Sequence, residues 1–390
     1  MSPVKISIAQ ARWFKFRRSG LLQPFDNAAD AARQLIGIQA QLPVAADLSL
    51  YNRIAGVSQA SLEQERIESK SIVRMWGQRN TVHLYATEDW PLLELWFRDR
   101  NSVLTAKFEE AGLAGVFNKL VRHFEQRLLS GEQLIYKDAS AFKGFSKLNA
   151  VREEWQTTTQ GLTTQGGSNW LVAYAAFMRL VRNGIACHGP DQNGESTFVH
   201  RQKWVPDLVW DQPAKDQSDA EAACRYLAAY GPATPHDLAA YFGTTITAAK
   251  TWIARADDRI VPVLVDEKKA VLLEADIDNV LEKPPAPAKW PLRLLYRFDP
   301  FVLGAVGSKN KEWLLDKDNF KKVWRPGAHI EAVILVGGRI MGTWRYNRRS
   351  KGLILEIKPF KPFNQRQNRE IAKQGAGIVN FLGQELIAIK

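Results

Sequence analysis

The sequence has few of the residues and motifs from which most enzyme sites are built. Two cysteines, Cys187 and Cys224, occur in 390 residues, and neither has neighbours at metal-ligand spacing. We expect buried thiols in a reducing compartment, not a disulfide framework. The six histidines are scattered, and no phosphate-binding loop, paired-glycine fingerprint or Gly-x-Ser-x-Gly elbow occurs. The sequence therefore predicts a protein without a metal ion or cofactor.

Long hydrophobic runs are also absent. No apolar run approaches the roughly 20 residues of a membrane span, and residues 1–10 lack the apolar centre of a signal peptide. The chain is 45% hydrophobic and 24% charged, which is typical of a globular protein with several domains. We expect a soluble, cytoplasmic monomer with no membrane partner.

Positive charge is concentrated at one end of the chain. The net charge is +12, and residues 290–390 hold 19 Lys and Arg against 8 Asp and Glu. A nearly neutral body with a basic C-terminal module is typical of a protein that binds a polyanion such as DNA. The alternative is a module that is basic only for solubility.

The same order of elements recurs along the chain, namely helices followed by a β-hairpin. We expect helices at 5–19, from 26–27 to the Gln39 region, and at 47–54, followed by a hairpin at 71–85. The second set has helices near 140–155 and 169–182, a polar connector at 157–168 and a hairpin at 185–201. The third set has helices at 219–230, 234–243 and 247–255, followed by strands at 260–265 and 270–273. Three helices followed by a hairpin is the order of a winged helix.

A proline-rich linker at 283–289 marks the clearest domain boundary. Strands are expected after it at 292–298, 331–336, 339–346 and 353–358, then a helix at 364–382 and a strand at 385–389. We therefore divide the chain into a first winged helix (1–98), a connector with a second (99–210), a third (211–282) and a basic β-module (283–390). The fold class is mainly α with β.

The segment Gln39-Ala40-Gln41-Leu42-Pro43 places two neutral amides just before a proline. On a regular helix, residues i and i+2 point about 200° apart. Pro43 would clash with the carbonyl four residues back, so we expect the helix to end near 39–41 and the backbone to bend until both amides converge. The spacing alone favours a plainer interpretation, a helix end with two solvated glutamines.

Four segments, in order, resemble the AlkZ/YcaQ-like winged-helix DNA glycosylases. They are 37–43, 73–90, 297–304 and 333–345. The resemblance covers nearly the whole chain and implies three tandem winged helices and a small C-terminal β-barrel, arranged as a C-shape around double-stranded DNA. It also implies that Gln39 and Gln41 are catalytic, as in the crosslink-unhooking branch of the family.

Neutral amides suit one class of leaving group. An N7-alkylguanine is already cationic and needs no general acid, so the barrier is mostly that of forming an oxocarbenium-like sugar and delivering water. A glutamine can position that water without being a strong base. The expected activity is monofunctional hydrolysis of the glycosidic bond of N7-alkylated purines, with interstrand crosslinks among the substrates. The alternatives are a non-catalytic winged-helix DNA-binding regulator and a nucleic-acid scaffold.

Other residues are candidates for supporting or DNA-binding roles. His83 either supports the catalytic amides or is a strand histidine bonded to a backbone carbonyl. Asp47 either bonds a glutamine or caps the helix at 48–54, and the cap is preferred. Asp299 is expected in a turn. The DNA-contact candidates are Arg79, Trp344, Arg345, Arg348, Arg349 and Lys351, with Lys321, Lys322, Arg366 and Arg369 weaker; a solvated charged turn is the alternative for the hairpin 343–351.

Overall fold

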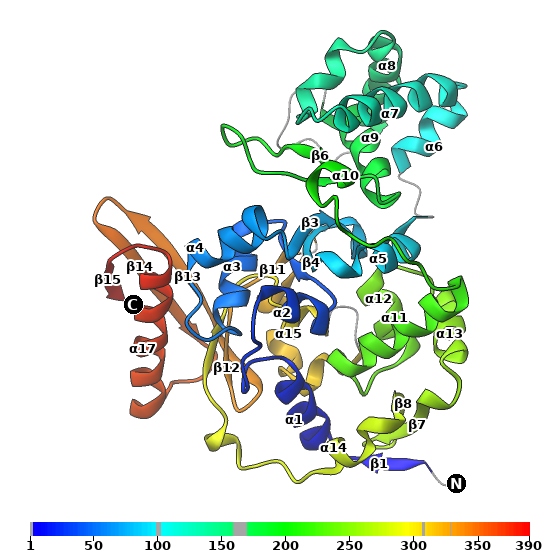
Figure 1. Ribbon diagram of the computed structural model, residues 1–390. Helices are drawn as coiled ribbons and strands as arrows, with labels where there is room; N and C mark the ends of the chain where they lie inside the picture. Colours follow the sequence, from blue (N-terminus) through cyan, green and yellow to red (C-terminus); the bar gives the residue numbers. More distant parts are fainter. Residues whose placement is uncertain (1–2, 99–102, 159–169, 306–308, 328) are drawn as a thin grey trace. The chain divides into compact units, whose positions relative to one another are not determined.

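The computed structural model describes residues 3–98, 103–158, 170–305, 309–327 and 329–390 (Figure 1). The fold is mixed α and β, and its contacts group into two compact units. The first unit consists of Met1–Ile72, Gln78–Ala86 and Ala214–Lys390, and the second of Val73–Gly77 and Thr87–Pro213. The division into four consecutive domains and the three winged helices stay predictions. The polar connector expected at 157–168 lies almost wholly outside the described residues.

The first unit begins with a short strand, where one helix over 5–19 was expected. β1 (Val4–Ile6) pairs in parallel with β7 (Ile260–Val265), which pairs with β8 (Lys268–Leu273). Helix α1 (Ile8–Arg18) starts only after Ser7, whose side chain accepts the Gln10 N–H at 3.2 Å. This capping box fixes the helix start, so the preceding residues are free to form the strand. Ile6 and Phe14 then pack with Val263 and Leu272 in one core.

The remaining helices of the first unit fall into two groups. The N-terminal group is α2 (Ala28–Gln34), α3 (Pro43–Tyr51) and α4 (Gln59–Glu63), which continues into a π-helical turn η1 (Gln64–Glu68). The group before β7 and β8 is α11 (Lys215–Tyr230), α12 (Pro235–Phe242) and α13 (Ile246–Arg255), with α14 (Ile277–Leu281) after them. Short 3₁₀ turns are η5 (Asp257–Arg259), η6 (Glu274–Asp276), η7 (Pro287–Lys289), η8 (Lys309–Trp313) and η9 (Lys317–Asn319).

The basic C-terminal module contains an open five-stranded sheet. Its strands are β9 (Arg293–Leu295), β12 (Val333–Val336), β13 (Arg339–Arg349), β14 (Gly352–Pro359) and β15 (Leu386–Ile389), in the order β15-β14-β13-β12-β9. Because β9 and β15 are its two edges, these strands do not form the closed barrel that was expected. The sheet packs against α17 (Gln365–Phe381), drawn in red in Figure 1. The smaller elements are α15 (Pro300–Leu303), α16 (Phe320–Val323), β10 (Trp324–Arg325) and β11 (His329–Ile330).

The second unit packs helices around an aromatic core. Phe177 stacks on Phe124 and Phe198, with ring centroids 4.5 and 4.0 Å apart. Its helices are α5 (Trp90–Phe97), α6 (Val103–Glu110), α7 (Ala114–Leu129), α8 (Phe145–Thr158), α9 (Trp170–Arg182) and α10 (Arg201–Trp204), with 3₁₀ turns η3 (Thr87–Asp89) and η4 (Tyr136–Ala141). Its strands are β3 (Ile72–Trp76), β5 (Ala186–His188) and β6 (Phe198–His200).

Candidate active site

Gln39 ends a short strand and Gln41 lies in the bend after it, so the segment that holds them is not the end of a helix. α2 ends at Gln34, and the chain reverses through Ile36 (φ 53°) and Gly37 (φ 90°). The Gly37 N–H donates to Ala32 O at 2.7 Å and closes this left-handed turn. A side chain at Gly37 would meet the Tyr85 ring at 2.5 Å, so the turn requires glycine. Pro43, which was expected to end a helix, instead begins α3.

Both glutamines contact the segment that leads into the neighbouring strand β4 (Val82–Ala86). β2 (Ile38–Gln39) pairs with β4, with Gln39 opposite His83, and the Ala40 N–H donates to Val82 O at 2.7 Å. Gln41 lies just beyond the strand, in a bend, so the chain bends here as the sequence suggested, although after a strand and not at a helix end. Gln39 is buried (6% exposed), whereas Gln41 is exposed.

Each amide oxygen has a partner that can only donate. Gln39 Oε1 accepts from Arg79 Nη2 at 3.3 Å, and Gln41 Oε1 accepts the Val82 N–H at 3.2 Å. A guanidinium and a backbone N–H have no lone pair to offer. These contacts therefore determine which end of each amide is oxygen, a choice that geometry alone leaves open. Each NH₂ group consequently points away from its amide oxygen's partner.

Arg79 is turned toward Gln39. It lies in the 3₁₀ turn η2 (Gln78–Asn80) with a left-handed backbone (φ 55°). Its Nη1 donates to Tyr241 O, and its guanidinium lies 5.2 Å from the Tyr241 ring centroid. Burial lowers the pKa of Arg79, which the surrounding tyrosines partly oppose. We therefore place Arg79 in the candidate active site and do not retain it among the proposed phosphate contacts.

His83 lies beside Arg79 and is uncharged. It is 1% exposed, and its Nδ1 lies 2.9 Å from Thr81 O. Because a carbonyl only accepts, Nδ1 carries the proton, and the lone pair of Nε2 faces Arg79 Nη2 at 3.5 Å. Burial first, and Arg79 second, lower the His83 pKa from 6.5 to about 3, against the opposing effect of the Thr81 hydrogen bond. The histidine thus has the backbone partner expected of a structural role and also lies next to a partner of Gln39.

A buried polar network holds the left-handed turn that precedes β2. The hydroxyls of Tyr230 and Tyr241 donate to Leu35 O at 2.8 and 2.9 Å. Gln78, which is fully buried, donates from Nε2 to Ile36 O at 2.7 Å and accepts from the Tyr85 hydroxyl. Sequence reasoning missed these residues, because their partners lie up to about 200 residues away and leave no local pattern.

Asp47 has a different role from either one expected. It is the fifth residue of α3, so it caps no helix. Its carboxylate forms an ion pair with Arg66. The cap interpretation of Asp47 is therefore wrong.

Strands β13 and β14 form the hairpin that was predicted to contact DNA. Some of its candidate residues are buried and others are exposed. Trp344 is 2% exposed and its Nε1 donates to Leu295 O at 3.0 Å, so it supports the sheet from within and is not retained as a DNA contact. Arg345 Nε donates to Glu356 at 2.6 Å. Arg348, Arg349 and Lys351 are exposed at the end of the ladder, where Arg349 pairs with Gly352.

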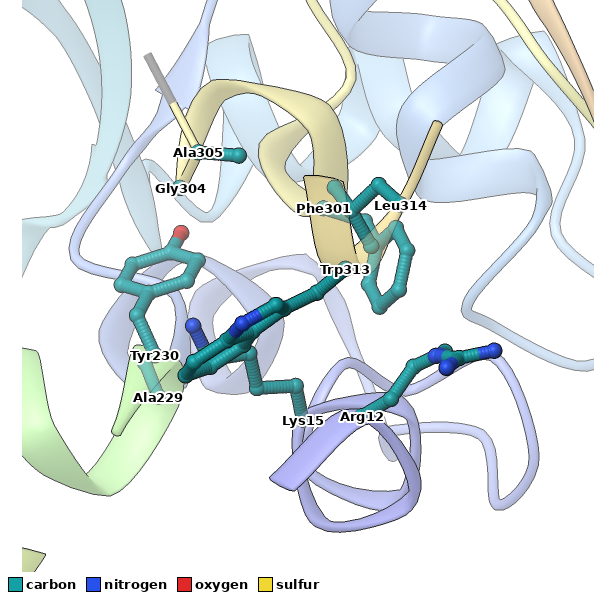
Figure 2. A pocket seen from close by; sticks show the side chains of 9 residues that line it. All are labelled: Arg12, Lys15, Ala229, Tyr230, Phe301, Gly304, Ala305, Trp313 and Leu314. Atoms are coloured by element: carbon teal, nitrogen blue, oxygen red, sulfur yellow. The ribbon is translucent and has the colours of Figure 1, made fainter. Parts of the chain in front are cut away.

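The first unit also contains a pocket, shown in Figure 2. Its lining residues are Arg12, Lys15, Ala229, Tyr230, Phe301, Gly304, Ala305, Trp313 and Leu314. Lys15 Nζ lies 4.8 Å from the Trp313 ring centroid, and burial lowers the Lys15 pKa to about 8. None of the candidate catalytic or DNA-contact residues named from the sequence lines this pocket. Tyr230 is its link to the network around Gln39.

Among the described residues, no three His, Cys, Asp or Glu side chains gather in a group that could hold a metal ion. No helix in that part of the chain combines the length and apolar character needed to cross a membrane.

Comparison with known proteins decides the family. The model of a family described as "DNA glycosylase AlkZ-like" matches residues 32–381. The chain belongs to the AlkZ-like DNA glycosylase family. A curated relative, the "Interstrand DNA cross-link repair glycosylase" of Streptomyces sahachiroi, is 23% identical over 376 residues, which cover 93% of each chain. The solved structure of "Streptomyces sahachiroi DNA glycosylase AlkZ" matches 99% of this chain and 100% of its own, with a TM-score of 0.74 and 20% identity.

The family match confirms the resemblance drawn from the four sequence segments. The likeness to the solved structure confirms the mixed α and β fold. This AlkZ-like chain is thus a DNA glycosylase by family, and the roles of its individual residues are proposals.

Proposed function

We propose that this AlkZ-like glycosylase hydrolyses the N-glycosidic bond of N7-alkylated purines, with a water molecule positioned by Gln39 and Gln41. The observation that carries the proposal is that two neutral amides, at the end of β2 and in the bend after it, both bond to the neighbouring segment 79–82. Their oxygens accept from Arg79 and Val82, and the adjacent His83 is neutral. The two groups that donate to these amides, the Arg79 guanidinium and the Val82 N–H, are not carboxylic acids.

This arrangement suits a leaving base that already has a positive charge. Amides and a neutral imidazole of pKa about 3 cannot protonate a departing base near pH 7. A cationic N7-alkylpurine departs as a neutral base without that proton, so the protein has only to position water and hold the sugar. We therefore propose that uracil and intact adenine are not substrates.

The relative's name extends the proposal to crosslinked DNA. That protein is an interstrand DNA cross-link repair glycosylase, and it matches this chain over 93% of both. A crosslink joined through N7 of guanine has the same cationic purine on each strand. We propose that this chain unhooks such crosslinks as well as releasing monoadducts, and that it acts by hydrolysis alone, without cleaving the DNA strand.

The proposed DNA contacts are the exposed cations at the end of the β13–β14 hairpin, Arg348, Arg349 and Lys351, with Arg345 as a weaker candidate because Glu356 already binds it. The order of α11, α12, α13, β7 and β8 supports a winged helix in the third set, and we propose tandem winged helices as the frame that binds the duplex.

The test is incubation of the protein with duplexes containing one N7-methylguanine or one defined N7-guanine crosslink. The expected products are free alkylguanine and abasic sites, with strand breaks only after alkaline treatment. Duplexes with uracil or undamaged adenine are the controls. Strand breaks without alkali would contradict hydrolysis alone. No base release from any alkylated duplex would overturn the proposed function.

A further inference from the structure

We infer that Arg79 is a positioning residue that assigns the two amides different tasks. Gln39 presents its NH₂ to the substrate as a donor, and Gln41 is the amide whose oxygen accepts from water. The inference rests on the proposed function and deepens it.

The first step concerns the Gln39 oxygen. It accepts a charge-assisted hydrogen bond from Arg79 Nη2, and the side chain is 6% exposed, which leaves its oxygen little room for a second partner. The oxygen and nitrogen of an amide point away from their shared carbon in different directions. With the oxygen bonded to Arg79, the group that Gln39 can offer a reacting molecule is its NH₂.

The second step concerns Gln41. Its oxygen accepts from a neutral backbone N–H at 3.2 Å, which occupies one of two lone pairs, and its side chain is exposed. The second lone pair can therefore accept from a water molecule. A water held by one donor and one acceptor is fixed in both position and orientation, which two identical amides would not achieve.

The third step is that Arg79 itself is held firmly. Its Nη1 is bound to Tyr241 O, and Nη2 also faces the lone pair of neutral His83 at 3.5 Å. Its backbone is left-handed, a conformation that non-glycine residues rarely adopt and that clusters at functional sites. Gly243 makes room for it, since a Cβ there would lie 3.0 Å from Arg79 Cα.

The test compares single-turnover base release by Gln39→Glu, Gln39→Met and Gln41→Glu. A glutamate at 39 keeps an acceptor for Arg79 but has no NH₂, so it should be as slow as the methionine variant, about 10²-fold below wild type, the size expected when one preorganised donor is removed. Gln41→Glu keeps its acceptor and should be at least about tenfold faster than Gln39→Glu. Equal rates for the two glutamate variants, or an active Gln39→Glu, would overturn the division of tasks and leave the glycosylase proposal standing.

Arg79→Met separates positioning from DNA binding. We expect slower base release with unchanged DNA affinity and salt dependence, and the double variant with Gln39→Met should be no slower than Gln39→Met alone, because Arg79 acts through Gln39. A weaker affinity with a salt slope reduced by about 1 would instead make Arg79 a phosphate contact. The matched control is Arg293→Met, which removes another partly buried guanidinium that donates to Leu21 O at 2.7 Å, and it should leave base release unchanged.

One readout does not depend on turnover. The Gln39 side-chain NH₂ resonances in a ¹H–¹⁵N spectrum, identified by their disappearance in Gln39→Met, should shift in Arg79→Met and stay in place in Arg293→Met. Unshifted resonances in Arg79→Met would show that Arg79 does not hold this amide. A protein that releases no base but shows the shift would contradict the proposed function and not the role of Arg79.

Discussion

Arg53 and Asp299 form a bidentate ion pair that is fully buried. The Nη1–Oδ2 and Nη2–Oδ1 distances are both 2.8 Å, and both side chains are 0% exposed. Arg53 also donates to Ser19 O and Ser49 O, and Asp299 caps α15 by accepting the Phe301 N–H. Asp299 was expected only in a turn, but it also forms this buried ion pair. The pair ties the end of α3, which begins just after Gln41, to the basic C-terminal module.

Breaking this pair should strongly destabilise the protein. Asp299→Asn leaves the Arg53 charge buried without a counter-ion, which costs about 3–5 kcal/mol of unfolding free energy. Urea denaturation followed by tryptophan fluorescence measures the decrease. Lys5→Met is the matched control, because it removes an ion pair with Glu267 whose side chains are both 72% exposed and should change stability little. Equal effects of the two substitutions would contradict the buried pair.

Removing either amide should stop base release without unfolding the protein or weakening DNA binding. Gln39→Ala removes the donor held by Arg79, and Gln41→Ala removes the exposed acceptor. Single-turnover rates should fall by about 10²-fold or more for each, while the affinity for alkylated duplex and the thermal midpoint stay close to wild type. Unchanged turnover in both variants would exclude the glutamines from catalysis.

The hairpin cations should contribute to affinity through phosphates. Replacing both Arg348 and Arg349 with Gln should lower the slope of log K against log salt by about 1 for each phosphate that the variant no longer neutralises. Arg345→Gln should have a smaller effect, because Glu356 already neutralises that guanidinium. Binding titrations at several salt concentrations provide the slopes. A double variant with the wild-type slope would show that this hairpin does not contact the DNA backbone.

The local signals in the sequence predicted many elements well. Helix α12 was expected at 234–243, and the structure shows why: Thr234 and Asp237 form a capping box, and Gly243 ends the helix in a left-handed conformation. The hairpin between β3 and β4 and the strands β12 to β14 were also expected close to their observed positions. These elements have caps, turns or alternating patterns within a few residues.

The geometry of the site could not be predicted in this way. β2 has two residues, too few for a periodic pattern, and the left-handed Ile36 is a conformation that its own β-branched side chain disfavours. Hydrogen bonds from Tyr230 and Tyr241 to Leu35 O override that local preference. Arg79 was expected to contact DNA, whereas its observed partners Gln39 and Tyr241 are distant from it in the sequence.

Replacing His188, a second buried histidine, should make the protein more stable. His188 is 6% exposed between Trp76 and Phe198, with both ring centroids 4.7 Å away, and neither ring nitrogen has a hydrogen-bond partner in the described part of the chain. His188→Phe removes these unpaired polar atoms and should raise the unfolding free energy by about 1–3 kcal/mol. His200→Phe is the contrast, because His200 Nδ1 accepts the Gln202 N–H at the start of α10, and removing that acceptor should destabilise the protein. A decrease in stability in His188→Phe would show that its ring nitrogens are bonded in solution.

His83 should make the protein less stable in mild acid. Its pKa is 6.5 when unfolded and about 3 when folded, so between these values the unfolded chain binds more protons than the folded one. The contribution of neutral His83 to the unfolding free energy is therefore fully present above pH 6.5 and is lost as the pH falls toward 3. At pH 5 the loss is about 2 kcal/mol. His83→Asn does not titrate, and its amide can still donate to Thr81 O. Between pH 8 and pH 5 this variant should lose about 2 kcal/mol less stability than the wild type in urea denaturation. An identical pH dependence in both proteins would show that His83 protonates readily in the folded state and that the site beside Gln39 is not kept neutral.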